Sequence, residues 1–528
     1  MPAWAVFSGV LGFCFWGSRK GPRAGLIFLW AAWLAACSLF SAEPLNSFWQ
    51  LSLWLTYFIS YFCAAACGGE DEKNFFVKLL LWTSALFSVF IIAGNICGAD
   101  LAKLLLPPNQ NYAAALISAG FVGSAWALLS EKGIKARFVW AALLLLAGAA
   151  LLEIKSRGAL LGAGAGFAYL CFYLGKKRLL AWVAGAVLLA ALLFPAVLDP
   201  VLKKHQRFRY ERVNIWKTAV LSALDKPLFG WGPGCFERAY LQRNFPAFNG
   251  LAYYNNYTGN AHSQLLQQAA ETGVIGAGFF LLFFLPLFRV RDRGRLREAA
   301  MLLCLFAISL FDGIMALPLI SATMFVLAAF LRDSEEEYRR GPVLAVLLFV
   351  GVGLVCGTAQ QGLKKSAFAG PDAPLRADAL NKLSLFQPCD DAIYSALAAL
   401  AQSPAEAAEL LERAVTLNPY NAVYRFRLAQ ALTALGARAK AGEELSRAVE
   451  LEPNFQRAAL ALASQRLSAG DEIGARKLFE SSESVRLRFG SYRSQSGYES
   501  ELLSADPERV VLLYRAAEAA KRGKKVLR

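Results

Sequence analysis

Residues 138–154 read FVWAALLLLAGAALLEI, and after a short polar step a second apolar run, GALLGAGAGFAYLCFYL, fills 158–174. Each run is about as long as an α-helix must be to cross the hydrocarbon core of a bilayer, roughly 17–25 residues. Similar runs recur as far as about Ala359, and 56% of the 528 residues are hydrophobic. The pattern predicts an all-α, polytopic membrane helical bundle.

The apolar runs number about twelve, and the eleventh is short. We predict membrane spans at 3–17, 24–40, 48–67, 75–98, 112–130, 138–154, 158–174, 179–198, 273–288, 299–317, 319–331 and 343–358. Most of the ten cysteines fall inside these runs or at their ends, as small membrane hydrophobes do. Neither a disulfide framework nor a zinc site is expected.

Positive charge is distributed unequally between the short loops. Eighteen Lys and Arg side chains lie in one alternating set of loops, and only Lys103, Lys155 and Arg157 lie in the short loops of the other set. The positive-inside rule makes the first set cytoplasmic, so both termini and the long loop 199–272 are expected outside the cytoplasm. The net charge of +16 is therefore a topology signal, and we expect no nucleic-acid partner.

The last third of the chain has a repeat. AVTLNP at 414–419 returns as AVELEP at 448–453, an offset of 34 residues. This segment resembles the tetratricopeptide repeat in period and residue types; an ordinary helical bundle that happens to repeat is the alternative. We predict a membrane domain at 1–358 that includes loop 199–272, a linker at 359–375 and a TPR-like helical-repeat domain at 376–528. Such a repeat offers a binding surface to a protein partner but performs no chemistry.

Chemistry is expected in the long loop, because it contains the only two histidines, His205 and His262. His262 stands in NAHSQLLQQAAETGVIGAGFF at 260–280, where the loop re-enters the predicted bundle. A histidine accepts a proton near neutral pH, which suits a general base. A solvated surface histidine is the plainer alternative.

Three stretches resemble the O-antigen ligase and polymerase family. The first has the family's histidine, Leu-Gln step and Glu-x-Gly-x-x-Gly turn at His262, Leu266-Gln267 and Glu271–Gly276, although Ser263 stands where the family commonly has Asn. The second is RVNIWKTAVLSALDKPLFGWGPGCF at 212–236, with Arg212, Trp216 and the Gly-x-Gly-x-Gly turn. The third is the Ser156-Arg157-Gly158 step. The resemblance covers about 1–340.

The resemblance implies a glycosyltransferase of the bacterial inner membrane that acts in cell-envelope polysaccharide biosynthesis. Its donor would be a glycan on a polyprenyl (undecaprenyl) pyrophosphate, and its acceptor a hydroxyl of a glycan, a lipid or a protein, so ligation, polymerisation and protein O-glycosylation stay open. Arginine binds phosphate oxygens in a bidentate manner, and His262 would activate the acceptor. The expected catalytic residues are His262, Arg157 and Arg212, and the expected substrate-binding residues are Arg209, Trp216, Tyr253, Tyr254 and Glu271.

No Asp-x-Asp motif is present, so we expect a metal-independent enzyme without a cofactor.

Other interpretations of these residues and of the whole chain remain. Arg157 could only extend to the membrane interface, and the tyrosines could be loop core or interfacial anchors. The whole chain could instead be a membrane-anchored TPR scaffold for envelope polysaccharide assembly, without catalysis. Convergence of Arg157, Arg212 and His262 would favour the enzyme.

Overall fold

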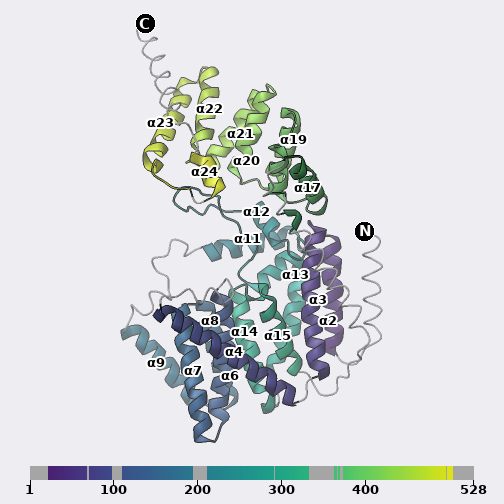
Figure 1. The fold of residues 1–528 in the computed structure, drawn as a ribbon, viewed down its shortest axis with the longest axis vertical. Helices are drawn as coiled ribbons and strands as arrows, with labels where there is room; N and C mark the ends of the chain where they lie inside the picture. The colour runs from purple at the N-terminus through teal and green to yellow at the C-terminus, as the bar shows by residue number, and fades with distance from the viewer. Residues whose placement is uncertain are drawn as a thin grey trace. The chain divides into compact units, whose positions relative to one another are not determined.

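The structure is a computed structural model, and its described residues form two units. It describes residues 22–67, 70–97, 110–193, 211–290, 292–331, 362–364, 367–368, 373–494 and 496–503. Unit 1 comprises Met1–Phe236 and Asn260–Gly357, and unit 2 comprises Glu237–Gly259 and Thr358–Arg528. Helices are the only regular secondary structure in the described ranges (Figure 1), which confirms the predicted all-α class there.

Unit 1 is a bundle of mostly apolar helices. Its α-helices are α2 (Pro22–Leu39), α3 (Pro44–Cys67), α4 (Glu70–Cys97), α6 (Gln110–Ser130), α7 (Ile134–Ile154), α8 (Arg157–Tyr173), α9 (Lys177–Leu193), α11 (Glu211–Asp225), α13 (Gln264–Phe284), α14 (Leu296–Phe311) and α15 (Pro318–Phe330). Three short 3-10 helices follow or precede these: η1 (Leu285–Phe288), η2 (Arg293–Arg295) and η3 (Ile314–Ala316). A helix lies within every predicted span except 3–17 and 343–358, which are outside the described residues.

Four helical stretches in the described ranges are long and apolar enough to cross a membrane. They are Glu70–Ile96, Gln110–Ser130, Ile134–Ile154 and Gln264–Phe288. Two shorter apolar helices lie at Ala24–Leu39 and Pro318–Phe330. The chain is therefore a membrane protein by length and composition of its helices, while the number of twelve spans stays a prediction.

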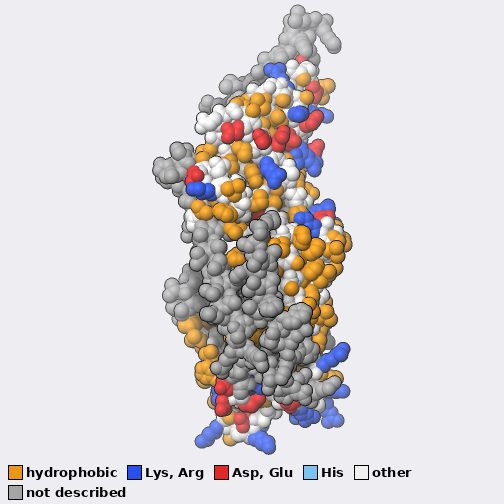
Figure 2. Space-filling model, turned by 90° about the vertical axis from the view of Figure 1, so that its right-hand side faces the viewer, with side chains coloured by type: hydrophobic (Ala, Val, Ile, Leu, Met, Phe, Trp, Pro, Cys, Tyr) orange, Lys and Arg blue, Asp and Glu red, His pale blue; other side chains and the backbone are white. Residues whose placement is uncertain are grey.

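The helices of unit 1 differ in how much of their surface is buried inside the protein. The most apolar stretch of α6 is 72% buried, whereas that of α7 is 17% buried, with Phe138 and Leu145 each 72% exposed. An exposed apolar helix is destabilised in water but stabilised in lipid. In Figure 2, hydrophobic side chains cover much of the surface of unit 1 that is formed by described residues, as a lipid-facing surface requires.

Helix α8 packs against α14 through a line of glycines. Gly158, Gly162 and Gly166 recur every four residues, so they lie on one face of α8. A Cβ atom at Gly162 would lie 2.7 Å from the carbonyl oxygen of Cys304, and one at Gly166 would lie 2.9 Å from that of Ala300. These glycines therefore let the two backbones approach closely, as small residues do between membrane helices, and they fix the start of α8 beside the end of α14.

Helix α13 is kinked at Gly273, which has φ 71° and ψ −178° inside the helix. The glycine-rich turn 227–234 packs into this kink. Three backbone hydrogen bonds join them, in which N–H groups donate to carbonyl oxygens: Trp231 to Ala270 at 3.0 Å, Gly232 to Glu271 at 2.9 Å and Val274 to Pro227 at 2.9 Å. Gly230 also has a positive φ of 67°, which favours glycine. The turn thus satisfies backbone groups that the kink would otherwise leave unpaired.

Substitution of Gly273 by alanine is expected to destabilise the protein by about 3 kcal/mol or more, the range for a strained backbone combined with a steric clash. Its Cβ atom would overlap the carbonyl oxygen of Leu228 at a positive φ. Gly278→Ala on the same helix is the matched control, because nothing lies within 4 Å of its Cβ position. Thermal unfolding in detergent checks this, and equal melting temperatures for the two variants would contradict it.

Unit 2 contains the helical repeat. Its helices are α17 (Ala373–Phe386), α18 (Asp391–Ala398), α19 (Pro404–Leu417), α20 (Ala422–Ala434), α21 (Arg438–Leu451), α22 (Gln456–Ser468), α23 (Glu472–Phe489) and α24 (Gly497–Leu503). Helices α19, α21 and α23 begin at Pro404, Arg438 and Glu472, which are 34 residues apart as the sequence repeat requires. Ala414 and Ala448 are fully buried where the paired helices meet.

Part of the long loop also belongs to unit 2. Residues 237–259, which include most of α12 (Phe236–Gln242), group with the repeat helices. The predicted boundaries kept all of loop 199–272 with the membrane domain, so the structure divides the chain differently at this segment. The physical reason is a set of buried contacts between the segment and the repeat, described below.

Candidate functional site

Asp312 joins two of the predicted site residues. It follows the last residue of α14, and its side chain is 5% exposed. Arg212 on α11 donates from Nη2 to Asp312 Oδ2 at 3.1 Å and from Nη1 to the carbonyl oxygen of Phe311 at 3.0 Å. His262 Nδ1 lies 3.4 Å from Asp312 Oδ1. One carboxylate therefore holds the arginine and the histidine side by side.

The backbone of His262 has an unusual conformation. His262 has φ 50°, a region that side-chain-bearing residues rarely occupy. Its N–H donates to Asn260 Oδ1 at 2.6 Å, and the preceding N–H, of Ala261, donates to Gln267 Oε1 at 2.6 Å. Asn260 packs so closely on Gly313 that a Cβ atom there would overlap it. Such strain persists only where surrounding contacts impose it, and it often marks a functional site.

Trp216 lies one helical turn after Arg212 on α11 and supports the same site. Its Nε1 donates to the carbonyl oxygen of His262 at 3.4 Å, and its ring lies 6.3 Å from that of Phe311. The Arg-x-x-x-Trp spacing therefore places both side chains on one face of α11. Here Trp216 contacts the histidine backbone.

Arg157 is the first residue of α8. Lys155, with φ 57°, ends α7, and Ser156 is the N-cap residue of α8, so the chain reverses in a tight turn. A Cβ atom on the next residue, Gly158, would lie 3.8 Å from Asp312 Cβ. Arg157 is half-buried, and no hydrogen bond or ion pair joins its side chain to another described residue. Arg212 and His262 thus share Asp312, and Arg157 directly precedes the glycine that packs beside it.

The site lies at one end of the helices of unit 1. It is built from the start of α8, the end of α14 and the residues before α13. The opposite end of α13 and α14 is joined by the arginine-rich stretch 289–297. The structure therefore places the site and the positively charged loop at opposite ends of the same two helices (Figure 1).

Glu271 supports the site from within the protein. It is 2% exposed, and its Oε1 accepts from the Phe236 N–H at 3.3 Å and from Gln267 Nε2 at 2.7 Å. Gln267 in turn accepts from the Ala261 N–H beside His262. Its contacts here are with the protein's own groups, so Glu271 links the glycine-rich turn to the histidine.

Three further residues were predicted to bind substrate: Tyr253, Tyr254 and Arg209. Tyr253 and Tyr254 belong to unit 2, where the Tyr254 ring stacks on Tyr420 at 5.3 Å. Arg209 and the second histidine, His205, lie outside the described residues.

The sequence interpretation missed two carboxyl groups at the site. Asp312 lies inside the predicted span 299–317, and an acidic residue within a predicted span is itself a signal of function that could have identified it. Glu211 is next to Arg212; burial raises the pKa of its carboxyl above the ordinary value, and the nearby charge of His262 opposes that rise. Glu211 is thus a further polar group close to the histidine.

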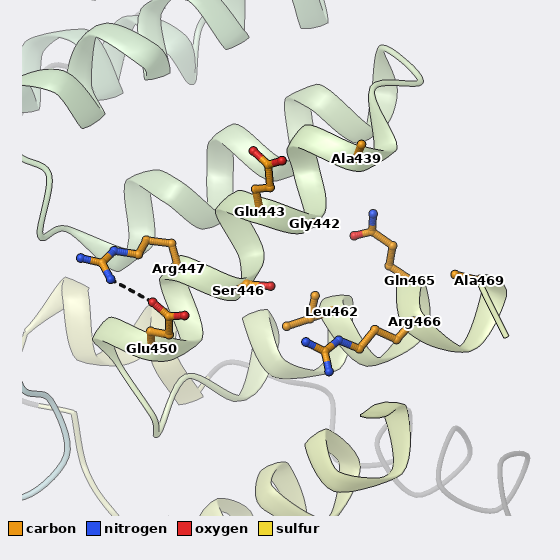
Figure 3. A pocket seen from close by; sticks show the side chains of 10 residues that line it. All are labelled: Ala439, Gly442, Glu443, Ser446, Arg447, Glu450, Leu462, Gln465, Arg466 and Ala469. Atoms are coloured by element: carbon orange, nitrogen blue, oxygen red, sulfur yellow. Dashed lines mark hydrogen bonds and ion pairs between the residues drawn. The ribbon is translucent and has the colours of Figure 1, made fainter. Parts of the chain in front are cut away.

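Unit 2 has an open groove of its own, which is lined mostly by polar, charged and small side chains. It has a volume of about 540 Å³ and lies between α21 and α22 (Figure 3). Its charged lining includes Arg447 and Glu450, which pair at 2.9 Å, together with Glu443 and Arg466. No histidine or cysteine lines it. In the described parts of both units, no group of three or more His, Cys, Asp or Glu side chains could hold a metal ion.

Comparisons with known proteins match the two units separately. A family model described as O-antigen ligase matches residues 141–281, which include Arg157, Arg212 and His262 but not Asp312. A family model described as tetratricopeptide repeat matches residues 380–465.

Examples of individual proteins show similarity that is short in extent or weak overall. The inactive TPR repeat-containing thioredoxin TTL3 of Arabidopsis thaliana is 42% identical over 72 residues, which is 14% of this chain and 10% of that protein. The chain therefore spans about a tenth of the length of this curated relative. The solved structure of MamA has a TM-score of 0.24 and 19% identity, covering 28% of this chain and 90% of that one. Yeast Tom70 has a TM-score of 0.22 and 14% identity, covering 80% and 96%. By the two family models, and as its motifs predicted, the chain carries an O-antigen ligase domain at 141–281 followed by tetratricopeptide repeats at 380–465.

Proposed function

We propose that the protein is an inverting, metal-independent glycan transferase that moves a polyprenyl-pyrophosphate-linked oligo- or polysaccharide to an acceptor hydroxyl. The observation that supports this most strongly is the group around Asp312. A phosphate-binding arginine, Arg212, and a potential base, His262, share that carboxylate, and Arg157 begins the helix packed beside it. A scaffold without catalysis gives no reason for this convergence.

The histidine would act as general base. A proton on His262 Nδ1 is stabilised by the Asp312 carboxylate 3.4 Å away, which leaves the lone pair on Nε2 as proton acceptor. The acceptor hydroxyl gives its proton to Nε2 while its oxygen forms a bond to the anomeric carbon. Long contacts of this kind commonly shorten when substrate binds.

The leaving group takes the electrons of the broken bond. The bond between the anomeric carbon and the pyrophosphate oxygen breaks, and polyprenyl pyrophosphate departs with the electron pair. Attack opposite the leaving group inverts the anomeric configuration. Arg157 and Arg212 would stabilise the developing charge through N–H donors to phosphate oxygens, a task that metal ions perform in other transferases.

We also propose that the site and unit 2 lie outside the cytoplasm of a bacterial inner membrane. The support is the loop charge count, since the arginine-rich stretch 289–297 lies at the opposite ends of α13 and α14 from the site. A dual reporter fused at Gly470 is expected to give the periplasmic signal. Only the cytoplasmic signal would overturn this topology and put the repeat among cytosolic partners.

The proposed function is tested by transfer in vitro. Purified full-length protein is incubated with a defined polyprenyl-pyrophosphate oligosaccharide and, in parallel, with glycan, lipid and peptide acceptors. Transfer to one acceptor class, unaffected by a chelator, is expected. Donor binding without transfer to any acceptor would favour the scaffold, and activity that a chelator abolishes and a divalent cation restores would overturn the metal-independent mechanism.

A further inference from the structure

The tip of the long loop, residues 249–254, is bound by the helical repeat within unit 2. The backbone N–H groups of Tyr253 and Tyr254 donate to the two carboxylate oxygens of Glu452, each at 2.7 Å. On the same surface, Asn454 Nδ2 donates to the carbonyl oxygen of Leu251 at 2.7 Å. Glu452 is fully buried at the end of α21, and Asn454 is 6% exposed. The repeat therefore recognises both donors and acceptors of the loop backbone.

The loop tip is preorganised for this contact. Asn249 Oδ1 accepts from the N–H groups of Leu251 and Ala252 at 3.1 and 2.9 Å, which closes a tight turn. Gly250 has φ 114°, a value that favours glycine. Because the turn forms through its own bonds, ordering it costs little conformational entropy when it binds.

The loop tip also fills apolar space in the repeat. Leu251 and Ala252 are fully buried, and they belong to one hydrophobic cluster with Phe426, Phe455 and Leu502 of the repeat helices. Complete burial of a leucine side chain removes its apolar surface from water and so stabilises the bound tip. The tip is therefore part of the core of unit 2.

Further contacts surround the tip along several repeat helices. They are Arg238 to Asp390 at 3.1 Å and to Asp391 at 3.2 Å, Gln242 Nε2 to the carbonyl oxygens of Thr416 at 2.9 Å and Leu417 at 2.7 Å, Asn249 to Glu499 at 2.9 Å and Asn255 to Ser496 at 3.0 Å. The residues before the tip thus bind α18 and the end of α19, while the tip and its flanks bind the end of α21 and the start of α24, so contacts on several helices fix its position.

Both ends of the bound segment join the candidate site through the chain. Before the segment, the Phe236 N–H donates to Glu271, and after it Asn260 accepts from the His262 N–H. The segment 237–259 is therefore continuous in the chain, at each end, with a residue that is hydrogen-bonded within the site. The sequence alone would assign the repeat to an outside partner, whereas its buried backbone-binding groups have partners in its own chain.

We propose that the repeat domain is an internal clamp, which binds the tip of the chain's own loop and so keeps His262 and the glycine-rich turn in the arrangement that transfer needs. The partner that this repeat surface fits is a short turn with a Leu-Ala pair and two adjacent free N–H groups. The role in transfer rests on the proposed function, while the binding of the loop tip does not.

Hydrogen exchange on the full-length protein tests the clamp from both of its sides. Glu452→Ala removes the acceptor on the repeat, and Ala252→Arg places a large charged side chain at a fully buried position of the tip without altering the repeat. In both variants the amides of Tyr253 and Tyr254 are expected to exchange at least about tenfold faster than in the wild type, because local opening exposes them. The controls are Glu450→Ala, next to the clamp but paired at the surface, and Tyr257→Arg, at a side chain that is 75% exposed; both should exchange as the wild type does.

Transfer is measured on the same proteins. Both clamp variants are expected to transfer at least about tenfold more slowly with donor binding retained, since a small misplacement of a catalytic group is costly. If the amides of Tyr253 and Tyr254 exchange at the wild-type rate in Ala252→Arg, and the amides of α20–α22 do so too, the proposal that the repeat binds the tip is wrong. Faster exchange with full transfer would overturn the clamp's role. A wild-type protein that transfers to no acceptor would refute the proposed function, and the exchange result would still decide whether the tip is bound.

Discussion

Glycan transfer by His262→Ala is expected to be about 10²–10⁴-fold slower than transfer by the wild type, the usual contribution of a positioned proton acceptor. The reason is that Asp312 orients the ring through Nδ1 and the positive φ of His262 is imposed by Asn260. Donor binding should survive, because the proposed pyrophosphate contacts belong to the arginines. Transfer rates and donor affinity are measured on the same preparations.

Two variants make this assignment specific. His205→Ala removes the protein's other histidine and should remain active. Asp312→Asn removes the carboxylate that orients both His262 and Arg212, so in the double variant with His262→Ala only the part that acts through Arg212 should add to the loss. A His262→Ala variant near wild-type activity, or an inactive His205→Ala, would show that the wrong histidine was chosen. Additive losses would separate Asp312 from the base.

Much of the fold follows from sequence patterns with strong physical causes. Apolar runs of membrane length became helices wherever the structure describes them, and the 34-residue offset reappears in the starts of α19, α21 and α23. Helix ends were less predictable. The predicted span 273–288 begins at the glycine where α13 kinks, while the helix itself begins at Gln264, because the glycine-rich turn 227–234 satisfies the backbone at the kink.

The candidate site could be predicted only where a residue type is unusual in its place. His262 is one of two histidines, and Arg157 and Arg212 matched family motifs. Asp312 could not be assigned a role by spacing, since its contacts with Arg212 and His262 are made across 100 and 50 residues of chain. Only the fold, which brings α11 and the residues before α13 to the end of α14, reveals that these residues meet.

The tyrosines illustrate a different limit. Tyr253 and Tyr254 were predicted to bind substrate through their side chains. Neither hydropathy nor spacing indicates that Glu452, about 200 residues later, accepts hydrogen bonds from their backbone N–H groups. Neither the sequence of the loop tip nor the sequence around Glu452 has a feature that indicates binding. Their complementarity exists only in the folded chain.

Arg157→Ala and Arg212→Ala are each expected to reduce transfer by about 10²–10³-fold, as loss of a donor to developing negative charge does. Lysine at either position should restore little, because its ammonium group lacks the bidentate fork of arginine. The two variants should differ in stability. Arg212 pairs with Asp312, which is 5% exposed, so its loss leaves a buried carboxylate with one cationic partner fewer and lowers the melting temperature.

Arg157 makes no hydrogen bond or ion pair with another described residue, so Arg157→Ala should melt like the wild type while losing transfer. Arg137→Ala is the matched control: this arginine is exposed in the first turn of α7, at the other end from the site, and its loss should change neither property. Binding of the lipid-linked donor should weaken in both site variants and not in the control. Loss of transfer together with weaker donor binding would support a role of Arg157 toward the anionic donor, and full transfer by Arg157→Ala would remove it from the site.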